Sequence, residues 1–168
     1  MNLFPSDVIG ASQALLASMR ALGAKLVTAE SCTGGLIAAA LTEIAGSSDV
    51  FERGFITYSN LAKAEALGVD KQLLMAAGAV SAETACAMAE GAITRSRATF
   101  AIAVTGIAGP DGGTPAKPVG LVYLATARRG ERATATEKRF GDLGRTEIRI
   151  ATVREAFALL QGLVGKSG

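Results

Sequence analysis

A cluster of reactive side chains stands near the start of the chain, at Ser31, Cys32 and Thr33, and is followed by Gly34 and Gly35. A short apolar run precedes the cluster and an alanine- and leucine-rich segment follows it, which predicts a turn between a strand and a helix. Such a turn leaves backbone N–H groups without partners at the helix N-terminus, where an anion or a developing oxyanion is stabilised. The stretch is therefore a candidate substrate site, although an ordinary helix cap with close-packed glycines explains it equally well.

The choice of base for a nucleophile in this turn is narrow, because the chain contains no histidine. A serine–histidine triad is excluded, and lysine is the usual substitute for the base. Lys63 is the candidate, since it follows a predicted strand end and its alanine neighbours permit a dry setting. A lysine that acts as a base must be neutral, which requires burial or a nearby cation to lower its pKa from about 10.4. A solvated position on a helix surface is the simpler interpretation of Lys63 taken alone.

Cys32 is the rival nucleophile, because a thiol at a helix N-terminus can have a lowered pKa. No histidine can pair with it, so we rank it below Ser31 and expect a buried packing role. Cys86 falls in a predicted alanine-rich helix and is expected in the core. The two cysteines have neither the pattern of a disulfide-rich secreted domain nor the spacing of metal ligands. We therefore expect reduced thiols in a cytoplasmic protein, with no metal and no cofactor.

A glycine-rich loop at residues 105–120 follows the most apolar segment, and a loop of about 15 residues in a compact domain usually has a function. Its glycine spacing matches neither the P-loop nor the dinucleotide-binding pattern. Its backbone N–H groups can still hold a phosphate, and three prolines restrict its freedom. Arg145, at the start of the last predicted helix, can reach a phosphate or a carboxylate, although a surface position explains it equally well.

Helices and strands alternate along most of the chain. Apolar spacing predicts helices at 6–22, 33–44, 61–67, 70–75, 81–96 and 145–164. Runs of β-prone residues predict strands at 25–30, 50–59, 99–104, 121–127 and 133–140. This order predicts one α/β domain over residues 1–168, a three-layer α/β/α sandwich with a mixed, mostly parallel sheet and antiparallel last strands. Ligands of such sheets bind beyond the carboxyl ends of the strands, where we expect loops 30–35, 58–63 and 105–120 to form one site.

Composition excludes several classes of protein. A chain of 168 residues suits one domain that can bury roughly 70% of its unfolded surface. Seventeen basic residues against fifteen acidic ones give no basic surface for nucleic acid, so no nucleic-acid partner is expected. No apolar run reaches the roughly 18 residues of a membrane span. The N-terminus lacks the basic flank and apolar core of a signal peptide, so neither a membrane span nor secretion is expected.

Four segments together carry a resemblance to a known family. They are Thr28-Ala29-Glu30-Ser31-Cys32-Thr33-Gly34-Gly35, Gly54-Phe55-Ile56-Thr57-Tyr58-Ser59-Asn60 continuing to Lys63, Gly78-Ala79-Val80-Ser81, and Thr105-Gly106-Ile107-Ala108-Gly109-Pro110-Asp111-Gly112-Gly113 with Lys117-Pro118-Val119-Gly120. In order and spacing, the chain closely resembles the C-terminal domain family of the competence/damage-inducible protein CinA, also known as nicotinamide-nucleotide amidohydrolases. The separate N-terminal domain that many members carry has no counterpart in the sequence, which looks like the stand-alone form.

The resemblance implies hydrolysis of the carboxamide of nicotinamide mononucleotide to nicotinic acid mononucleotide and ammonia, without a metal. It implies Ser31 as nucleophile and Lys63 as base, and the family's tendency together with the apolar composition leads us to expect a homo-oligomer. Backbone N–H groups of the turn after Ser31 are expected to stabilise the oxyanion, and the later glycine loop is expected to hold the phosphate with Arg145. The predicted substrate contacts are Tyr58, Thr33, Gly34, Gly35, Thr105, Gly106, Gly109 and Arg145.

Two other functions stay open at this point. One is a non-catalytic module that binds nucleotides or a protein partner in competence or DNA-damage responses. Such a module would keep the glycine loops but would have no need of a reactive Ser31. The other is an amidase for a different small amide, and ammonia release from a panel of amides separates the three possibilities.

Overall fold

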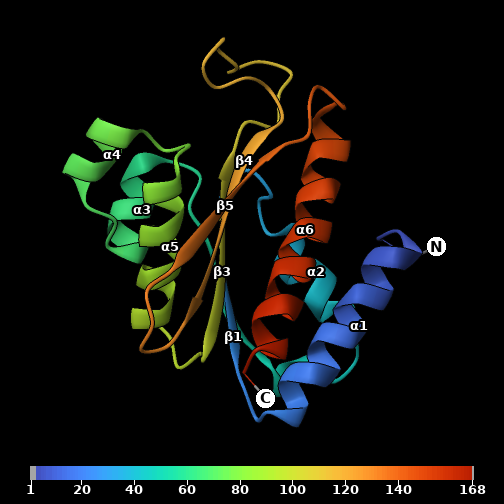
Figure 1. The fold of residues 1–168 in the computed structure, drawn as a ribbon. Coiled ribbons are helices and arrows are strands. Elements are labelled where there is room, and N and C mark those ends of the chain that lie inside the picture. Colours follow the sequence, from blue (N-terminus) through green and yellow to red (C-terminus); the bar gives the residue numbers. More distant parts are fainter. Residues whose placement is uncertain (1–2, 168) are drawn as a thin grey trace.

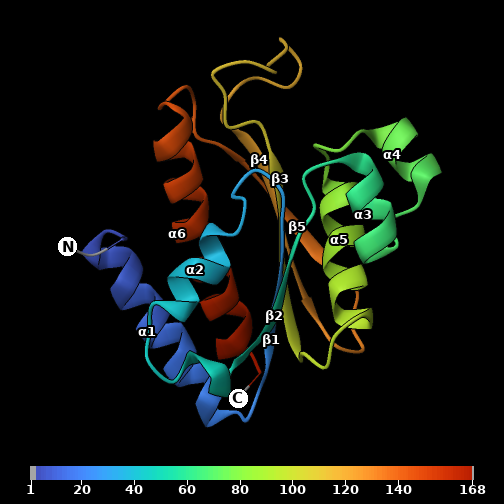
Figure 2. The same ribbon diagram turned by 180° about the vertical axis from the view of Figure 1, so that it is seen from behind.

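The protein, described over residues 3–167 by a computed structural model, contains a five-stranded sheet between two layers of helices (Figures 1 and 2). The strands are β1 (Leu26–Glu30), β2 (Phe51–Ile56), β3 (Phe100–Gly106), β4 (Leu121–Arg128) and β5 (Thr134–Arg139), in the order β2-β1-β3-β4-β5. Strands β2, β1 and β3 are parallel, and β4 and β5 are each antiparallel to the strand before them in the sheet. The predicted mixed α/β/α sandwich with antiparallel last strands is confirmed.

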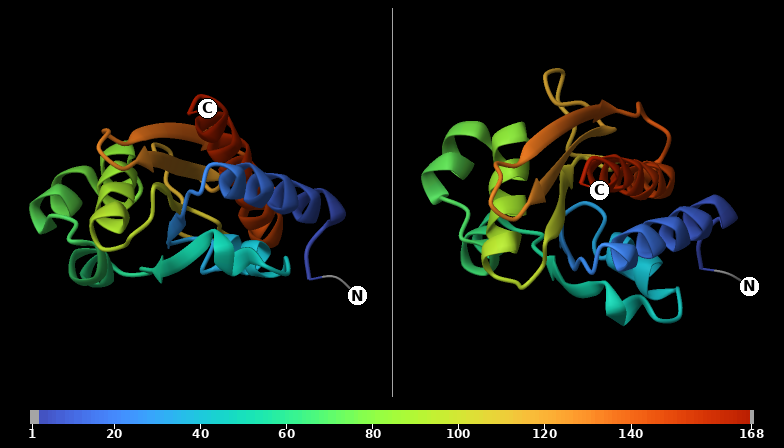
Figure 3. Two further views of the ribbon diagram at one scale, coloured as in Figure 1. Left: turned by 90° about the horizontal axis from the view of Figure 1, so that it is seen from below. Right: turned by 60° about the horizontal axis from the view of Figure 1, so that its bottom comes forward.

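Two groups of helices cover the two faces of the sheet (Figures 1 and 3). One face carries α1 (Ser6–Ala21), α2 (Leu36–Thr42) and α6 (Arg145–Gly165); the other carries α3 (Asn60–Leu67), α4 (Lys71–Ala77) and α5 (Ala82–Thr94). A short 3₁₀ turn, η1 (Ser47–Asp49), leads into β2. These bounds agree with the predicted helices within about two residues, except at the start of α2, where the prediction of residue 33 is wrong.

The start of α2 is delayed because two glycines keep the preceding chain in a turn. Gly34 and Gly35 have φ angles of 59° and 97°, in the left-handed region that only glycine adopts without strain. The helix therefore begins at Leu36, and residues 31–35 form a turn of their own between β1 and α2. The nucleophile candidates lie in that turn and not in the helix.

Small side chains bring the layers close together. The layer between the sheet and α5 is built mainly from alanines of α5, β3 and β4, and its larger members are Leu67, Leu74, Met88 and Ile93. The opposite layer holds larger side chains, including Phe100 and Phe157, against α1 and α6. Strand β3 is buried on both faces from Phe100 to Thr105, as its continuous apolar run predicts.

The carboxyl ends of the parallel strands β1, β2 and β3 meet at one edge of the sheet, the upper edge in Figure 1. The chain leaves this edge through residues 31–35, 57–59 and 107–120, so the three loops singled out by the sequence converge there. Within residues 3–167, no helix is long and apolar enough to cross a membrane.

Candidate active site

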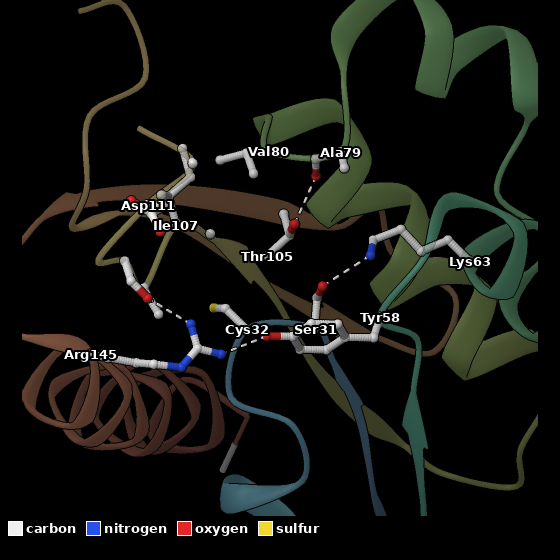
Figure 4. Close-up of a pocket in the computed structure, with 14 residues that line it drawn as sticks. Ser31, Cys32, Tyr58, Lys63, Ala79, Val80, Thr105, Ile107, Asp111 and Arg145 are labelled. Atoms are coloured by element: carbon white, nitrogen blue, oxygen red, sulfur yellow. Dashed lines mark hydrogen bonds between the residues drawn. The ribbon is translucent and has the colours of Figure 1, made fainter. Parts of the chain in front are cut away.

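A cavity of about 270 Å³ opens at this edge of the sheet (Figure 4). Residues from the three loops and the end of β3, from α3, from the link between α4 and α5 and from the start of α6 line it: Ser31, Cys32, Tyr58, Lys63, Ala79, Val80, Thr105, Gly106, Ile107, Ala108, Gly109, Asp111, Gly112 and Arg145. The structure therefore brings seven of the predicted site residues together, namely Ser31, Lys63, Tyr58, Thr105, Gly106, Gly109 and Arg145. Thr33, Gly34 and Gly35 do not line it.

Lys63 and Ser31 form a hydrogen-bonded pair inside the cavity. Lys63 Nζ lies 3.0 Å from Ser31 Oγ and donates to the carbonyl oxygen of Thr57 at 2.7 Å. The lysine is 1% exposed, so the interpretation of Lys63 as a solvated surface residue is wrong. Burial lowers its pKa below the ordinary 10.5, and the nearby Cys32 thiol opposes this shift. The pair has the contact and the desolvation that a serine nucleophile with a lysine base requires.

Local capping fixes where Lys63 points. The hydroxyl of Ser59 accepts the N–H of Ala62 and caps α3, which begins four residues after Ile56 ends β2. Lys63 lies in the first turn of this short helix and is directed back toward the strand end (Figure 4). A serine cap therefore places a lysine beside the turn that follows β1, 32 residues earlier in the chain.

Cys32 is buried beside Ser31, and burial raises the pKa of its thiol to about 12. A thiol with such a pKa is protonated at neutral pH and is a poor nucleophile. This supports the ranking of Cys32 below Ser31 and its interpretation as a packing residue. Cys86 is half-buried and packs against the core cluster around α5, so its predicted core position is met in part; neither cysteine is in a disulfide.

The carboxylate of Glu30, which is fully buried, occupies the N-terminus of α2. It accepts the hydroxyl of Thr33 at 2.7 Å and the N–H groups of Ile37 and Ala38 at 2.9 and 3.1 Å. A negative side chain therefore already satisfies the helix end that we expected to stabilise an anion. Glu30 was not predicted as part of the site, because its carboxylate folds back from a strand end to cap the next helix.

The prediction that Thr33, Gly34 and Gly35 line the substrate space is corrected, whereas an oxyanion contact from the backbone of this turn stays a prediction. The hydroxyl of Thr33 is used by Glu30, and the N–H of Gly34 donates to the carbonyl of Ser31 at 3.0 Å. Gly35 caps the helix and would bring a side chain against Ile56 of β2, outside the cavity. These three residues shape the turn, and the Thr33 hydroxyl and the Gly34 N–H are already in use within it.

Arg149 on α6 is a second residue that the sequence did not reveal. Its Nε donates to the carbonyl of Cys32 at 3.1 Å and its Nη2 donates to the carbonyl of Thr33 at 2.9 Å. The contact joins positions more than a hundred residues apart, and a single arginine on a helix gives no sequence signal for it.

Arg145 lies across the cavity mouth. Its Nη1 donates to the carbonyl of Gly109 at 2.7 Å and its Nη2 donates to the Tyr58 hydroxyl at 2.8 Å (Figure 4). Both partners are neutral, and no carboxylate within residues 3–167 forms a salt bridge with Arg145. Thr105 donates its hydroxyl to the carbonyl of Ala79 at 2.7 Å and holds the opposite wall. The arginine therefore has no salt-bridge partner, and it shares the cavity lining with one carboxylate, that of Asp111.

The fold and the cavity define an α/β protein with a buried serine–lysine pair at the carboxyl ends of its parallel strands. Among residues 3–167, no group of three or more Asp, Glu or Cys side chains could hold a metal ion. The sequence profile of the CinA C-terminal domain matches residues 10–164, and the chain belongs to that family.

Named relatives and solved structures support this assignment. A protein of Escherichia coli K12 named nicotinamide-nucleotide amidohydrolase PncC is 49% identical over 138 residues, which are 82% of this chain and 84% of that protein. A putative competence-damage inducible protein of Symbiobacterium thermophilum is 55% identical over 130 residues, which are 77% of this chain but only 30% of that longer protein. The crystal structure of the competence/damage inducible protein CihA from Agrobacterium tumefaciens superposes with a TM-score of 0.95 at 57% identity, covering 97% of this chain and 99% of that one.

Proposed function

We propose that this protein hydrolyses the carboxamide of nicotinamide mononucleotide, with Ser31 as nucleophile and Lys63 as base. The observation that carries the proposal is the 3.0 Å contact between Lys63 Nζ and Ser31 Oγ in a cavity where the lysine is buried. The name of the Escherichia coli relative supports the choice of substrate, because the alignment with that protein covers most of both chains.

The proposed reaction proceeds in two stages. Neutral Lys63 accepts the Ser31 proton, and Oγ attacks the carboxamide carbon to form a tetrahedral oxyanion. The lysine, held by the Thr57 carbonyl, then donates that proton to the departing nitrogen, which leaves as ammonia. Water attacks the resulting acyl-serine with Lys63 again as base, and the lysine returns the proton to Ser31 Oγ as the acyl group leaves. One amide and one water thus give one carboxylic acid and one ammonia, which at neutral pH become a carboxylate and an ammonium ion.

The positive end of the cavity is proposed to hold the nucleotide phosphate. Arg145 presents its guanidinium there, and Gly106, Gly109 and Gly112 of the loop bring backbone close to the same space. Glycines allow such close approach, and arginine forms paired hydrogen bonds with phosphate oxygens. Tyr58, which is 61% exposed, lies at the mouth beside Arg145.

Two substitutions test the proposed pair. Ser31→Ala and Lys63→Ala should each lower the rate of ammonia release by about 10³-fold or more, while calorimetric binding of nicotinamide mononucleotide is retained. Lys71→Ala, at an exposed position on α4, is the control and should keep the wild-type rate. A rate above a tenth of wild type in either site variant would show that the pair does not perform the chemistry.

The alternatives give different results in the same assay. A non-catalytic module in competence or DNA damage would bind the nucleotide and release no ammonia. An amidase for another substrate would release ammonia faster from another member of an amide panel. The buried lysine beside Ser31 favours an enzyme, because a binding module has no use for a desolvated base.

A cytoplasmic homo-oligomer remains part of the proposal. Large apolar side chains are exposed at Ile56 on β2, Leu61 on α3 and Met75 on α4, which supports contact with another copy. Light scattering of the purified protein measures the mass in solution, and a monomer mass at working concentration would contradict an oligomer. Cell fractionation tests the location.

A further inference from the structure

The turn that carries Ser31 is held by α6 through one side chain. Arg149 donates from two nitrogens of its guanidinium to the carbonyls of Cys32 and Thr33, two consecutive peptide groups. It makes no salt bridge within residues 3–167. A planar guanidinium that holds two neighbouring carbonyls fixes the orientation of both peptide planes.

A hydrogen bond that fixes a carbonyl also fixes the direction of the N–H in the same peptide plane. In a trans peptide the C=O and the next N–H point in opposite directions. Because the Cys32 carbonyl points at Arg149, the Thr33 N–H points away from it. The Gly34 N–H donates to the Ser31 carbonyl and so fixes the peptide plane between Ser31 and Cys32. The Cys32 N–H lies in that plane and points away from the Ser31 carbonyl.

Among the described residues, the turn keeps three N–H groups without an acceptor on another residue, those of Cys32, Thr33 and Gly35, and the first two lie nearest to Ser31 in the chain. Within residues 3–167, the Thr33 N–H has no hydrogen-bond acceptor, and the Cys32 N–H has only its own thiol, which is a weak one. The N–H groups of Ile37 and Ala38 are occupied by Glu30. The N–H of the residue after a nucleophilic serine is a common oxyanion donor in other hydrolases.

We propose that Arg149 is a positioning residue for the reaction. By holding the Cys32 carbonyl, it orients the Thr33 N–H directly. By holding the Thr33 carbonyl, it orients the Gly34 N–H, whose bond to the Ser31 carbonyl in turn fixes the Cys32 N–H. The Cys32 and Thr33 N–H groups are thereby held as donors for the oxyanion that forms when Ser31 attacks. Donors fixed before the reaction stabilise the transition state most, because they need not reorient as charge develops. This inference rests on the proposed serine chemistry and adds a residue outside the cavity to it.

Two other roles for Arg149, a substrate contact and a structural clamp, predict different kinetics for its variants. Arg149 does not line the cavity, so a direct contact with the substrate phosphate is not supported, whereas Arg145 one turn earlier does line it. A purely structural clamp between α6 and the turn would affect stability alone. Kinetics separate the three roles, since loss of a positioned donor lowers kcat, loss of a substrate contact raises KM, and loss of a clamp changes neither in the folded protein.

The kinetic test uses Arg149→Ala and Arg149→Lys with ammonia release as the readout. Arg149→Ala should lower kcat by about 10- to 100-fold with KM nearly unchanged, and added guanidinium should restore part of the rate. Arg149→Lys keeps the charge but only one directed contact, and should give an intermediate kcat. It also serves if the alanine variant fails to fold. Arg154→Ala, on the same helix in an exposed pair with Asp7, is the control and should match wild type.

A second readout separates this inference from the proposed substrate. A fluorophosphonate labels a reactive serine without nicotinamide mononucleotide: the Ser31 Oγ–P bond forms, fluoride leaves, and Lys63 takes the proton. Mass spectrometry should show slower labelling of Ser31 in Arg149→Ala than in wild type. If labelling depends on Arg149 but wild type releases no ammonia, the positioning role stands and the substrate is wrong. If kcat and labelling are unchanged in Arg149→Ala, or KM alone rises, the positioning role is refuted.

Discussion

Replacing Lys63 by Met removes the amine and keeps most of the side-chain length, so it tests whether the buried lysine is neutral in the folded protein. The lysine is 1% exposed, and burial lowers its pKa below the ordinary 10.5. Between the folded-state pKa and 10.5, the unfolded chain holds a proton that the folded chain has released. The free energy of unfolding of wild type therefore rises with pH in that window, and below it the penalty for Lys63 is constant.

The change in the free energy of unfolding with pH follows from the single proton that Lys63 releases in the folded state. Each pH unit within the window changes the free energy of unfolding by about 1.4 kcal/mol. Cys32 opposes it at high pH, because burial raises the thiol pKa from 9.0 to about 12 and the unfolded chain ionises first. Cys32 is present in both proteins, so the difference between wild type and Lys63→Met isolates the lysine to first order.

The measurement is urea unfolding of both proteins from neutral pH up to 10.5. The stability advantage of Lys63→Met should be largest at neutral pH and should shrink as the pH approaches 10.5. Lys71→Met, at an exposed position, should show no such trend. A difference between wild type and Lys63→Met that stays constant over the range would refute a lowered pKa. The same pKa should appear as the acid limb of kcat/KM, with activity rising as Lys63 loses its proton.

Two further predictions concern packing and thiol reactivity. A Cβ at Gly91 of α5 would overlap the carbonyl oxygen of Leu67, so Gly91→Ala should lose about 1–3 kcal/mol of stability despite the usual helix gain of about 0.5–1 kcal/mol. Gly162→Ala on α6, where the space is open, should keep or raise the melting temperature, and equal melting temperatures for the two variants would contradict the overlap. Cys32 should resist iodoacetamide at mildly alkaline pH in the native protein and react after unfolding in urea; rapid labelling of native Cys32 would contradict its raised pKa.

The parts of the site that follow from local sequence could be predicted. The strand–turn–helix at residues 26–42 is visible from the apolar runs and the paired glycines. The absence of histidine leaves lysine as the base, and Lys63 follows a strand parallel to β1. Parallel neighbours bring their carboxyl ends together, so Ser31 and Lys63 meet without any long-range information beyond the strand order.

The parts that depend on side chains folding back or crossing layers could not be predicted. Glu30 ends β1, and its carboxylate turns to cap a helix that begins six residues later. Arg149 reaches the same turn from α6, and its pairing depends on how that helix packs on the sheet. Neither contact has a fixed sequence spacing, so the anion site predicted from an open helix end is already filled by the protein's own carboxylate.

The burial of Lys63 links catalytic competence to a loss of stability. A buried amine must release its proton or remain charged in a dry setting, and either choice disfavours the folded state at neutral pH. Two acceptors, the Ser31 hydroxyl and the Thr57 carbonyl, hold the amine in place without a carboxylate that would keep it protonated. A neighbouring Asp or Glu would raise the pKa and remove the base. We therefore expect Lys63→Met to be more stable than wild type at neutral pH and inactive, which is the pattern of a residue placed for chemistry and not for folding.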